Sequence, residues 1–154
     1  MEIALFEPEI PPNTGNIARL CVNADVPLCI IGKPAFDMSE KAVRRAGLDY
    51  WQDLDLHLYS DYDSFLAEKQ QKAQRIFLIS KFGKTAYWDN RFQADDVLVF
   101  GKETSGLPEE IREAHPKERI LSIPMAAKSR SINLSNAVAI VLYEALRQKR
   151  LEPS

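Results

Sequence analysis

The stretch ILSIPMAAKSRSINLSNAVAIVLY, residues 120–143, contains the features that decide the fold of this chain. It opens with a short apolar segment at 120–123 that predicts a buried strand, and Pro124 ends this strand. After a polar segment, residues 137–146 predict a helix with almost no polar face. Because a helix that is apolar on all sides is normally buried, we expect this one to lie in a core or an interface.

The polar segment before this helix collects hydroxyls, amides and two cations: Lys128, Ser129, Arg130, Ser131, Asn133, Ser135 and Asn136. Free backbone N–H groups and the helix dipole at such an N-terminus favour bound phosphates and carboxylates. The alternative is a capped helix, with Ser131 or Ser135 as the cap, that follows an ordinary loop. On this stretch alone, the alternative is the simpler interpretation.

Length and composition indicate one globular domain over residues 1–154. The chain is 45% hydrophobic and 27% charged, which are ordinary values for a soluble protein. No apolar run approaches the roughly 20 residues of a membrane span. The N-terminus has acidic rather than basic residues, which argues against a secretory signal and favours a cytoplasmic protein without membrane association.

Cysteine usage and charge narrow the possible functions. The two cysteines, Cys21 and Cys29, form no CxxC pattern, and neither histidine lies at ligand spacing, so we expect buried thiols and no metal site. The net charge of −2 argues weakly against bulk electrostatic binding of nucleic acid, although local basic patches matter more. No GxGxxG motif occurs, and Leu78 stands where a P-loop ending at Gly83-Lys84-Thr85 would need glycine.

Apolar segments that predict strands alternate along the chain with segments that predict helices. The expected strands are 2–6, 28–31, 54–59, 75–80, 97–100 and 120–123, and the expected helices begin near Asn13, Asp37, Tyr62, Pro108 and Ala137. We expect Pro8, Pro11 and Pro12 to hold the connection before the first helix extended. This alternation predicts an α/β fold with a mainly parallel sheet flanked by helices on both faces.

Three loops with unusual chemistry each follow an apolar strand: residues 7–19, 101–106 and 124–136. Since ligands bind at the carboxyl ends of strands in open α/β sheets, we expect these loops to meet in one crevice. Their motifs are NTGNIAR at 13–19, GKETSG at 101–106 and SRSINLSNAVA at 129–139. Taken singly, each also fits a plain helix start or loop, with Arg19 on an outer helix face.

Taken together, in this order and spacing, the three motifs resemble the SPOUT class of RNA methyltransferases. The similarity is greatest to the TrmL (YibK) group of small tRNA 2′-O-methyltransferases, also through EPEIPPN at 7–13 and RRAGLDYW at 44–51. The resemblance extends over essentially the whole chain. It implies a parallel α/β domain with a C-terminal trefoil knot that binds S-adenosylmethionine. It also implies a homodimer packed through its first and last helices, with each active site completed by the partner subunit.

The resemblance implies a substrate and a set of site residues. The substrate is the wobble nucleotide of leucine tRNAs, a cytidine or a cmnm5-type uridine, methylated on its ribose 2′-oxygen. The implied cofactor-binding residues are Ile79, Gly101, Glu103, Leu107, Ile123 and Ser131. The implied catalytic residues are Arg19, Asn133 and Tyr143, with Asn13 helping to arrange the site. The implied RNA-binding residues are Arg19, Lys41, Arg44, Arg45 and Lys128.

Arg19 is interpreted as a phosphate clamp and electrostatic stabiliser, because a guanidinium is not deprotonated in proteins. The acceptor of the 2′-OH proton is therefore left unassigned. Lys102 and Ser105 depart from the family, which often has proline and a basic residue there, and this affects RNA choice more than cofactor binding. Two other hypotheses are an enzyme of this fold acting on another tRNA position or on rRNA, and a non-catalytic RNA-binding protein.

Overall fold

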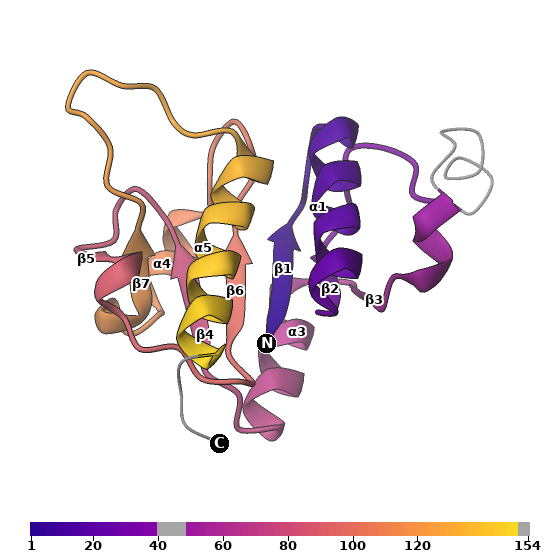
Figure 1. Cartoon of the computed structure of the whole chain (residues 1–154), viewed down its shortest axis with the longest axis horizontal. Helices are drawn as coiled ribbons and strands as arrows, with labels where there is room; N and C mark the ends of the chain where they lie inside the picture. The colour runs from indigo at the N-terminus through magenta and orange to yellow at the C-terminus, as the bar shows by residue number, and fades with distance from the viewer. Residues whose placement is uncertain (40–48, 151–154) are drawn as a thin grey trace.

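The computed structural model describes residues 1–39 and 49–150 (Figure 1). Seven strands form a single sheet: β1 (Glu2–Phe6), β2 (Leu28–Ile31), β3 (Leu56–Tyr59), β4 (Ile76–Ile79), β5 (Thr85–Ala86), β6 (Val97–Phe100) and β7 (Ile120–Ser122). The helices are α1 (Pro11–Ala24), α3 (Tyr62–Gln71), α4 (Glu109–Glu113) and α5 (Leu134–Arg150), with 3-10 turns at Asp49–Asp53, Tyr87–Asp89 and Lys117–Arg119. The helix expected at 37–45 falls mostly outside the described residues.

Every pair of neighbouring strands in the sheet is parallel, in the order β3-β2-β1-β6-β4-β7-β5. The predicted α/β fold with a parallel sheet is therefore confirmed. Because all strands run in one direction, the loops that follow β1, β6, β4 and β7 leave the sheet at the same edge, side by side. This edge is where ligands bind in open parallel sheets.

Helices cover both faces of the sheet, and alternate residues of each strand supply the two cores. On one face, Ile3, Leu5 and Leu98 pack with α1 and α5, which lie next to each other in front of the sheet in Figure 1. On the other face, Ala4 and Val99 pack with residues of α3 and α4. The central strands are buried on both sides, which explains their continuous apolar sequences.

Several elements differ from the sequence-based expectation, most clearly α1, β3 and β5. Helix α1 begins at Pro11, not at Asn13, so Pro11 and Pro12 form its first turn instead of an extended connection. Proline suits this position, because the first helical N–H groups have no partner inside the helix. Strand β3 begins at Leu56, not at residue 54, and the two-residue strand β5 was not expected.

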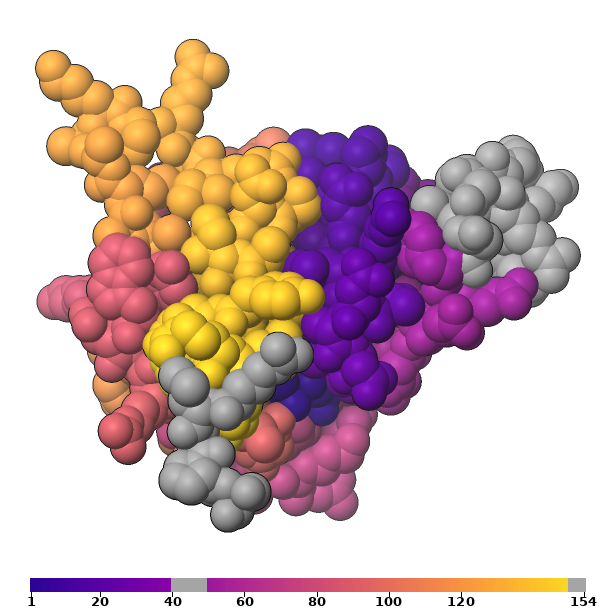
Figure 2. Space-filling model, viewed as in Figure 1, coloured from indigo at the N-terminus to yellow at the C-terminus, as the bar shows by residue number. Residues whose placement is uncertain are grey.

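Helix α5 is longer and less uniformly buried than its apolar sequence suggests. Asn133, not Ser131 or Ser135, caps the helix, since its Oδ1 accepts hydrogen bonds from the N–H groups of Ser135 and Asn136 at 2.9 and 3.3 Å. One side of the helix is fully buried, whereas Ile140 and Tyr143 on the other side are 36% and 50% exposed. Figure 2 shows this side of α5 next to α1 on one continuous surface.

The connection from β4 to β5 crosses directly over strand β7. The Ser80 N–H donates to the Leu121 carbonyl at 2.9 Å, and a Cβ on Gly83 would lie 2.5 Å from the Leu121 carbonyl carbon. Glycine is therefore needed at position 83, because any side chain would meet the β7 backbone. This contact places residues 80–84 over the strand from which the second half of the site emerges.

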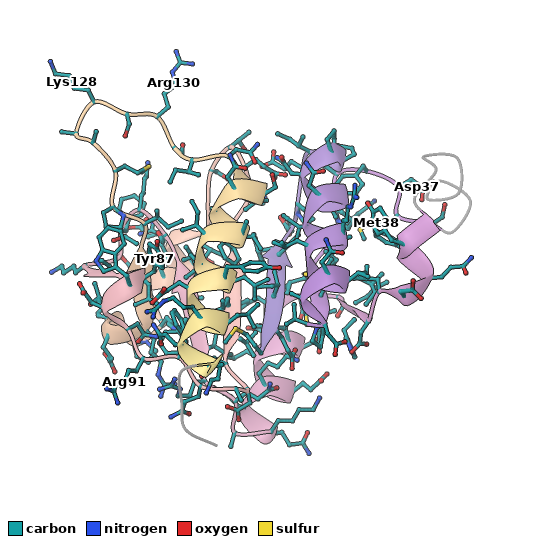
Figure 3. All side chains as sticks on the ribbon, in the orientation of Figure 1. Asp37, Met38, Tyr87, Arg91, Lys128 and Arg130 are labelled. Carbon is teal, nitrogen blue, oxygen red and sulfur yellow. The ribbon has the colours of Figure 1, made fainter. Side chains whose placement is uncertain are left out.

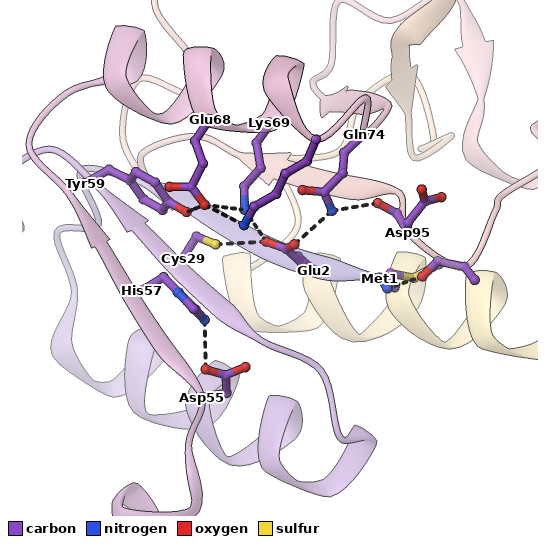
Figure 4. A network of polar contacts seen from close by, with 12 residues as sticks. Met1, Glu2, Cys29, Asp55, His57, Tyr59, Glu68, Lys69, Gln74 and Asp95 are labelled. Carbon is purple, nitrogen blue, oxygen red and sulfur yellow. Dashed lines mark hydrogen bonds and ion pairs between the residues drawn. The ribbon is translucent and has the colours of Figure 1, made fainter.

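At the amino-terminal edge of the sheet, a polar network surrounds the buried side chain of Lys69 (Figure 4). Lys69 is only 2% exposed, and its Nζ lies 2.5 Å from Glu2 Oε2. Gln74 Nε2 donates to the other Glu2 oxygen at 2.8 Å. Burial alone would raise the pKa of Glu2, but the hydrogen bonds from Lys69 and Gln74 outweigh burial and lower it.

Glu2→Gln should lower the free energy of unfolding by about 3 kcal/mol, because it removes the nearest counterion of the buried Lys69 ammonium and leaves only Glu68, at 4.0 Å. Urea unfolding at pH 7 measures this loss. Lys72→Ala is the control, since Lys72 is 56% exposed and pairs with Glu68 at the surface. We expect this control to change stability by no more than about 0.5 kcal/mol.

The same pair predicts a pH dependence. Burial alone would lower the pKa of Lys69, but its bond to Glu2 and neighbouring groups raise it above the ordinary 10.5. The contribution of Lys69 is therefore complete below pH 10.5 and is lost as the pH rises through the higher folded pKa. The wild type should lose stability above pH 10.5 more steeply than Glu2→Gln, and equal slopes would contradict this account.

Candidate functional site

A cavity of about 490 Å³ opens at the carboxyl-terminal edge of the sheet. Its volume lies within the range of roughly 300–1,000 Å³ that is typical of small-molecule sites. Loops after four strands line it, and their residues include Ile10, Asn13, Ile79–Phe82, Phe100–Leu107, Ile123, Met125, Ser131–Leu134 and Ala137. The three loops expected to converge are thus confirmed to meet, and the loop after β4 joins them.

Glu103 connects the loop after β6 to the start of α1. Its carboxylate accepts hydrogen bonds from the backbone N–H groups of Glu9 and Ile10, at 2.9 and 3.0 Å. It also accepts a longer bond of 3.4 Å from Asn13 Nδ2. A carboxylate is well suited to this position, because it offers acceptors only and faces three N–H donors at a helix N-terminus.

Asn13 extends this connection to the loop before α5. Its Oδ1 accepts a hydrogen bond of 3.0 Å from Asn133 Nδ2, and Asn133 in turn caps α5. Asn13 is 6% exposed, so its amide needs these partners. Glu103, Asn13 and Asn133 therefore form one chain of hydrogen bonds that runs across the three loops.

The loop at 101–106 is held tightly against the cavity wall. Lys102 and Gly106 exchange two backbone hydrogen bonds of 3.2 and 3.0 Å. A Cβ on Gly101 would lie 2.3 Å from the Gly106 carbonyl carbon and the Leu107 nitrogen, so only glycine fits there. The two ends of the loop thus approach each other closely, and all of its residues line the cavity.

Lys102, one of the two departures from the family pattern, has a defined partner. Its Nζ lies 2.7 Å from Glu7 Oε2, and this bond raises the pKa of Lys102. Glu7 is the first residue after β1 and has a positive φ of 42°, so the chain turns sharply there. On the same side, Thr104 Oγ1 donates to Glu9 Oε1 at 2.7 Å. Both contacts attach the loop at 101–106 to the segment before α1.

The structure places the expected cofactor-binding residues around this one cavity. Ile79, Gly101, Glu103, Leu107, Ile123 and Ser131 all line it, as does the expected catalytic residue Asn133. They come from the end of β4 and from the loops after β6 and β7, and the parallel strand order brings these segments together.

The remaining expected residues lie outside the cavity. Arg19 is exposed on α1, and Tyr143 is exposed on α5. Lys128 is exposed in the loop that projects from the body between β7 and α5, where Figure 3 shows its side chain and that of Arg130 pointing outward. Lys41, Arg44 and Arg45 lie outside the described residues.

The sequence reasoning missed the part of the cavity formed by Ser80, Lys81 and Phe82. This loop carries no glycine-rich or hydroxyl-rich motif of the kind that marked the others. The available signal was its position after the strand expected at 75–80, since all parallel strands end at the same edge. Ile10 and Met125, which are 42% and 41% exposed, were also missed, although they belong to the expected loops 7–19 and 124–136, because apolar residues in these loops carried no ligand signal.

Within residues 1–39 and 49–150, the potential metal ligands are scattered and the two cysteines are buried. No group of three potential metal ligands occurs in this part of the chain. Cys21 and Cys29 are buried free thiols, as expected, and burial raises the pKa of each to about 12. None of the helices described has the length and apolar character needed to span a membrane.

Glu103→Gln should destabilise the protein by about 1–3 kcal/mol, because the amide NH₂ group would face N–H donors and leave at least one of them unsatisfied. Chemical unfolding followed by circular dichroism measures this change. The control is Glu110→Gln, at an exposed position in the first turn of α4. If both variants were equally stable, Glu103 would not join the loops in the way described.

Comparison with known proteins gives consistent matches over nearly the whole chain. A tRNA (cytidine(34)-2′-O)-methyltransferase from Yersinia pestis is 49% identical over 151 residues, which cover 96% of this chain and 93% of that protein. A solved structure described as giving structural insights into the 2-OH methylation of C/U34 on tRNA is 40% identical. It has a TM-score of 0.88, with 98% of this chain and 97% of that chain covered.

A third match includes a bound cofactor. The SpoU methyltransferase AviRb from Streptomyces viridochromogenes, in complex with the cofactor AdoMet, is 25% identical with a TM-score of 0.83. The match covers 99% of this chain and 59% of that one. The model of the SpoU rRNA Methylase family matches residues 1–143. The chain therefore belongs to the SpoU rRNA methylase family.

Proposed function

We propose that this protein transfers the methyl group of S-adenosylmethionine to the ribose 2′-oxygen of the wobble nucleotide, at position 34, of leucine tRNAs. The observation that carries this proposal is the full-length similarity to tRNA (cytidine(34)-2′-O)-methyltransferases, at 49% identity for the Yersinia pestis protein. The target nucleotide would be a cytidine or a cmnm5-type uridine. We place the reaction in the cytoplasm, where tRNA is processed.

The cavity supports the proposed cofactor. Its volume of about 490 Å³ suits a ligand of this size, and both apolar and polar residues line its wall. Ile79, Leu107 and Ile123 would supply the apolar contacts, and the backbone at Gly101 and the side chain of Ser131 the polar ones. Glu103 would act indirectly, because its carboxylate is already engaged by Glu9, Ile10 and Asn13.

The bound cofactor would supply a methyl group on a sulfonium, ready for attack by an oxygen nucleophile. The residues of the protein would contribute mainly by positioning the reactants, since such a transfer needs the oxygen in line with the methyl group. Asn133 lines the cavity, and its amide is fixed between Asn13 and the first turn of α5. This contact gives Asn133 the rigidity that a positioning residue requires.

Arg19 and Tyr143 would complete the site of the partner subunit in a homodimer. They lie outside the cavity of their own subunit, on the exposed sides of α1 and α5. The two helices pack against each other, and Ile140 adds an exposed apolar side chain to the same side of α5. Pairing of this surface with its copy would cover these groups and bring Arg19 toward the other cavity.

A C-terminal trefoil knot is the second structural part of the proposal. Its support is the strand order, in which β7 lies between β4 and β5, and the passage of residues 80–84 directly over β7. The chain after β7 would then pass through this loop before α5 begins. We also propose that residues 1–154 act as one methyltransferase domain.

RNA recognition would depend on the dimer surface. Lys128 is well placed for a phosphate contact, because it lies exposed on the loop that leads from β7 to the cavity. We assign Lys41, Arg44 and Arg45 the same role. The alternative of a ribosomal RNA target is kept because the family model is named for rRNA methylases. Mapping of 2′-O-methyl nucleosides in cells with and without the protein would distinguish the targets.

Arg19→Ala should lower methyl transfer to tRNA by about 100-fold or more, since it removes a charge expected to stabilise the transition state. S-adenosylmethionine affinity, measured by isothermal titration calorimetry, should stay within about twofold because Arg19 does not line the cavity. The control Arg91→Ala removes another exposed arginine, which Figure 3 shows at the opposite end of the molecule from Lys128. Full activity of Arg19→Ala would remove this residue from the site, and a wild type that bound no cofactor would refute the function itself.

Ile140→Arg should convert the dimer into a monomer, because it introduces a charge into the proposed interface. Sedimentation velocity at several concentrations measures the change. Leu58→Arg, at a 68% exposed position on β3, is the control and should leave the dimer intact. A wild-type protein that sediments as a monomer throughout would exclude the proposed interface.

A further inference from the structure

Phe82 is an exposed aromatic residue at the mouth of the cavity, and it has no role in the function proposed above. It lies in the loop between β4 and β5, lines the cavity, and is still 58% exposed. A phenylalanine that filled the core would be buried, as Phe77 and Phe100 are at 2%. The ring therefore offers a large apolar surface to whatever occupies the outer part of the cavity.

The ring is supported by Arg112 from helix α4. The guanidinium carbon of Arg112 lies 4.0 Å from the ring centroid, within the range of cation–π stacking. Arg112 is itself anchored, because its Nε donates to the Leu107 carbonyl at 3.3 Å. Leu107 is buried in the cavity wall, so the ring, the guanidinium and the wall form one supported unit.

Lys81 adds a second cation beside this aromatic surface, and the loop after β7 carries two more on the same edge of the sheet. Lys81 Nζ lies 5.2 Å from the Phe82 centroid, and Lys81 also lines the cavity. The loop after β7, which contributes Met125 and Ser131 to the cavity, carries Lys128 and Arg130 exposed (Figure 3). An aromatic face among cations is the arrangement that binds unpaired nucleotides, where the base stacks and the phosphates meet the charges.

We propose that Phe82, held by Arg112, is a stacking platform for an unpaired nucleobase of the substrate RNA at the mouth of the cavity. The proposal rests on the proposed function and adds a positioning residue to it. The other possible source of a base is the adenine of the cofactor. The location favours RNA, because Phe82 is on the exposed rim, whereas the apolar residues assigned to the cofactor, Ile79, Leu107 and Ile123, are buried or half-buried.

The test compares Phe82→Ala, Phe82→Tyr and Leu58→Ala with the wild-type protein. Phe82→Ala should raise the KM for tRNA about 10-fold, which corresponds to the loss of one stacked base, while Phe82→Tyr keeps the wild-type KM. The affinity for S-adenosylmethionine, measured calorimetrically, should be the same in all four proteins. Leu58→Ala removes a similarly exposed apolar side chain from β3, away from the cavity, and should change none of these values.

A binding measurement tests the stacking platform independently of catalysis. Anticodon stem–loops with 2-aminopurine at one loop position at a time should show quenching at one position with the wild type and Phe82→Tyr, and none with Phe82→Ala. A loss of cofactor affinity in Phe82→Ala, with unchanged RNA affinity, would instead assign the ring to adenine and overturn the proposal. Unchanged tRNA KM and quenching in Phe82→Ala would also overturn it. Normal quenching without methyl transfer by the wild type would refute the function but not the platform.

Discussion

The site depends on a chain of three polar side chains, Glu103, Asn13 and Asn133. Glu103 accepts the N–H groups before α1, Asn13 lies buried between the two other residues, and Asn133 starts α5. The bonds of Glu103 span about ninety residues of sequence and the bond between Asn13 and Asn133 spans 120, and all of them lie at the edge where the sheet opens. Because a half-buried carboxylate or amide is costly without partners, each residue stabilises the position of the next. The shape of the cavity therefore follows from polar contacts as much as from the apolar core beneath it.

Much of the fold could be predicted from the sequence, because its main strands are short apolar runs and its ligand loops follow them directly. The alternation of strands and helices is enough to predict a parallel sheet, and the parallel sheet predicts that the loops meet. Local sequence patterns did not predict the roles of residues whose partners lie far away in the sequence. Asn13 looked like a helix start, yet it is buried inside α1 because its amide bonds to Glu103 and Asn133. Strand β5 has only two residues and pairs solely because β7 lies beside it.

The motifs of the candidate site could be predicted from the sequence, but the residues at the rim of its cavity could not. Residues with glycine, hydroxyl or amide chemistry were found from sequence, and they line the cavity. Phe82 and Arg112 were missed, since neither residue type at its position signals a ligand until the ring and the guanidinium are seen 4.0 Å apart. The exposed side of α5 shows the opposite case. Its apolar sequence predicted burial in a core or an interface, and the structure leaves Ile140 and Tyr143 exposed on it.

The position of β1 has a consequence for how the protein is made on the ribosome. Its two sheet neighbours are β2, which follows within thirty residues, and β6, which begins at Val97. During synthesis one edge of β1 must therefore stay unpaired, with its N–H and C=O groups accessible to other chains, until β6 has emerged from the ribosome. Helix α5 packs on the face of the sheet that includes Ile3 and Leu5 of β1, and it emerges later still. The nascent chain thus cannot complete its core in stages from the N-terminus, and it passes through a period in which chaperones have a strand edge and an apolar face to protect.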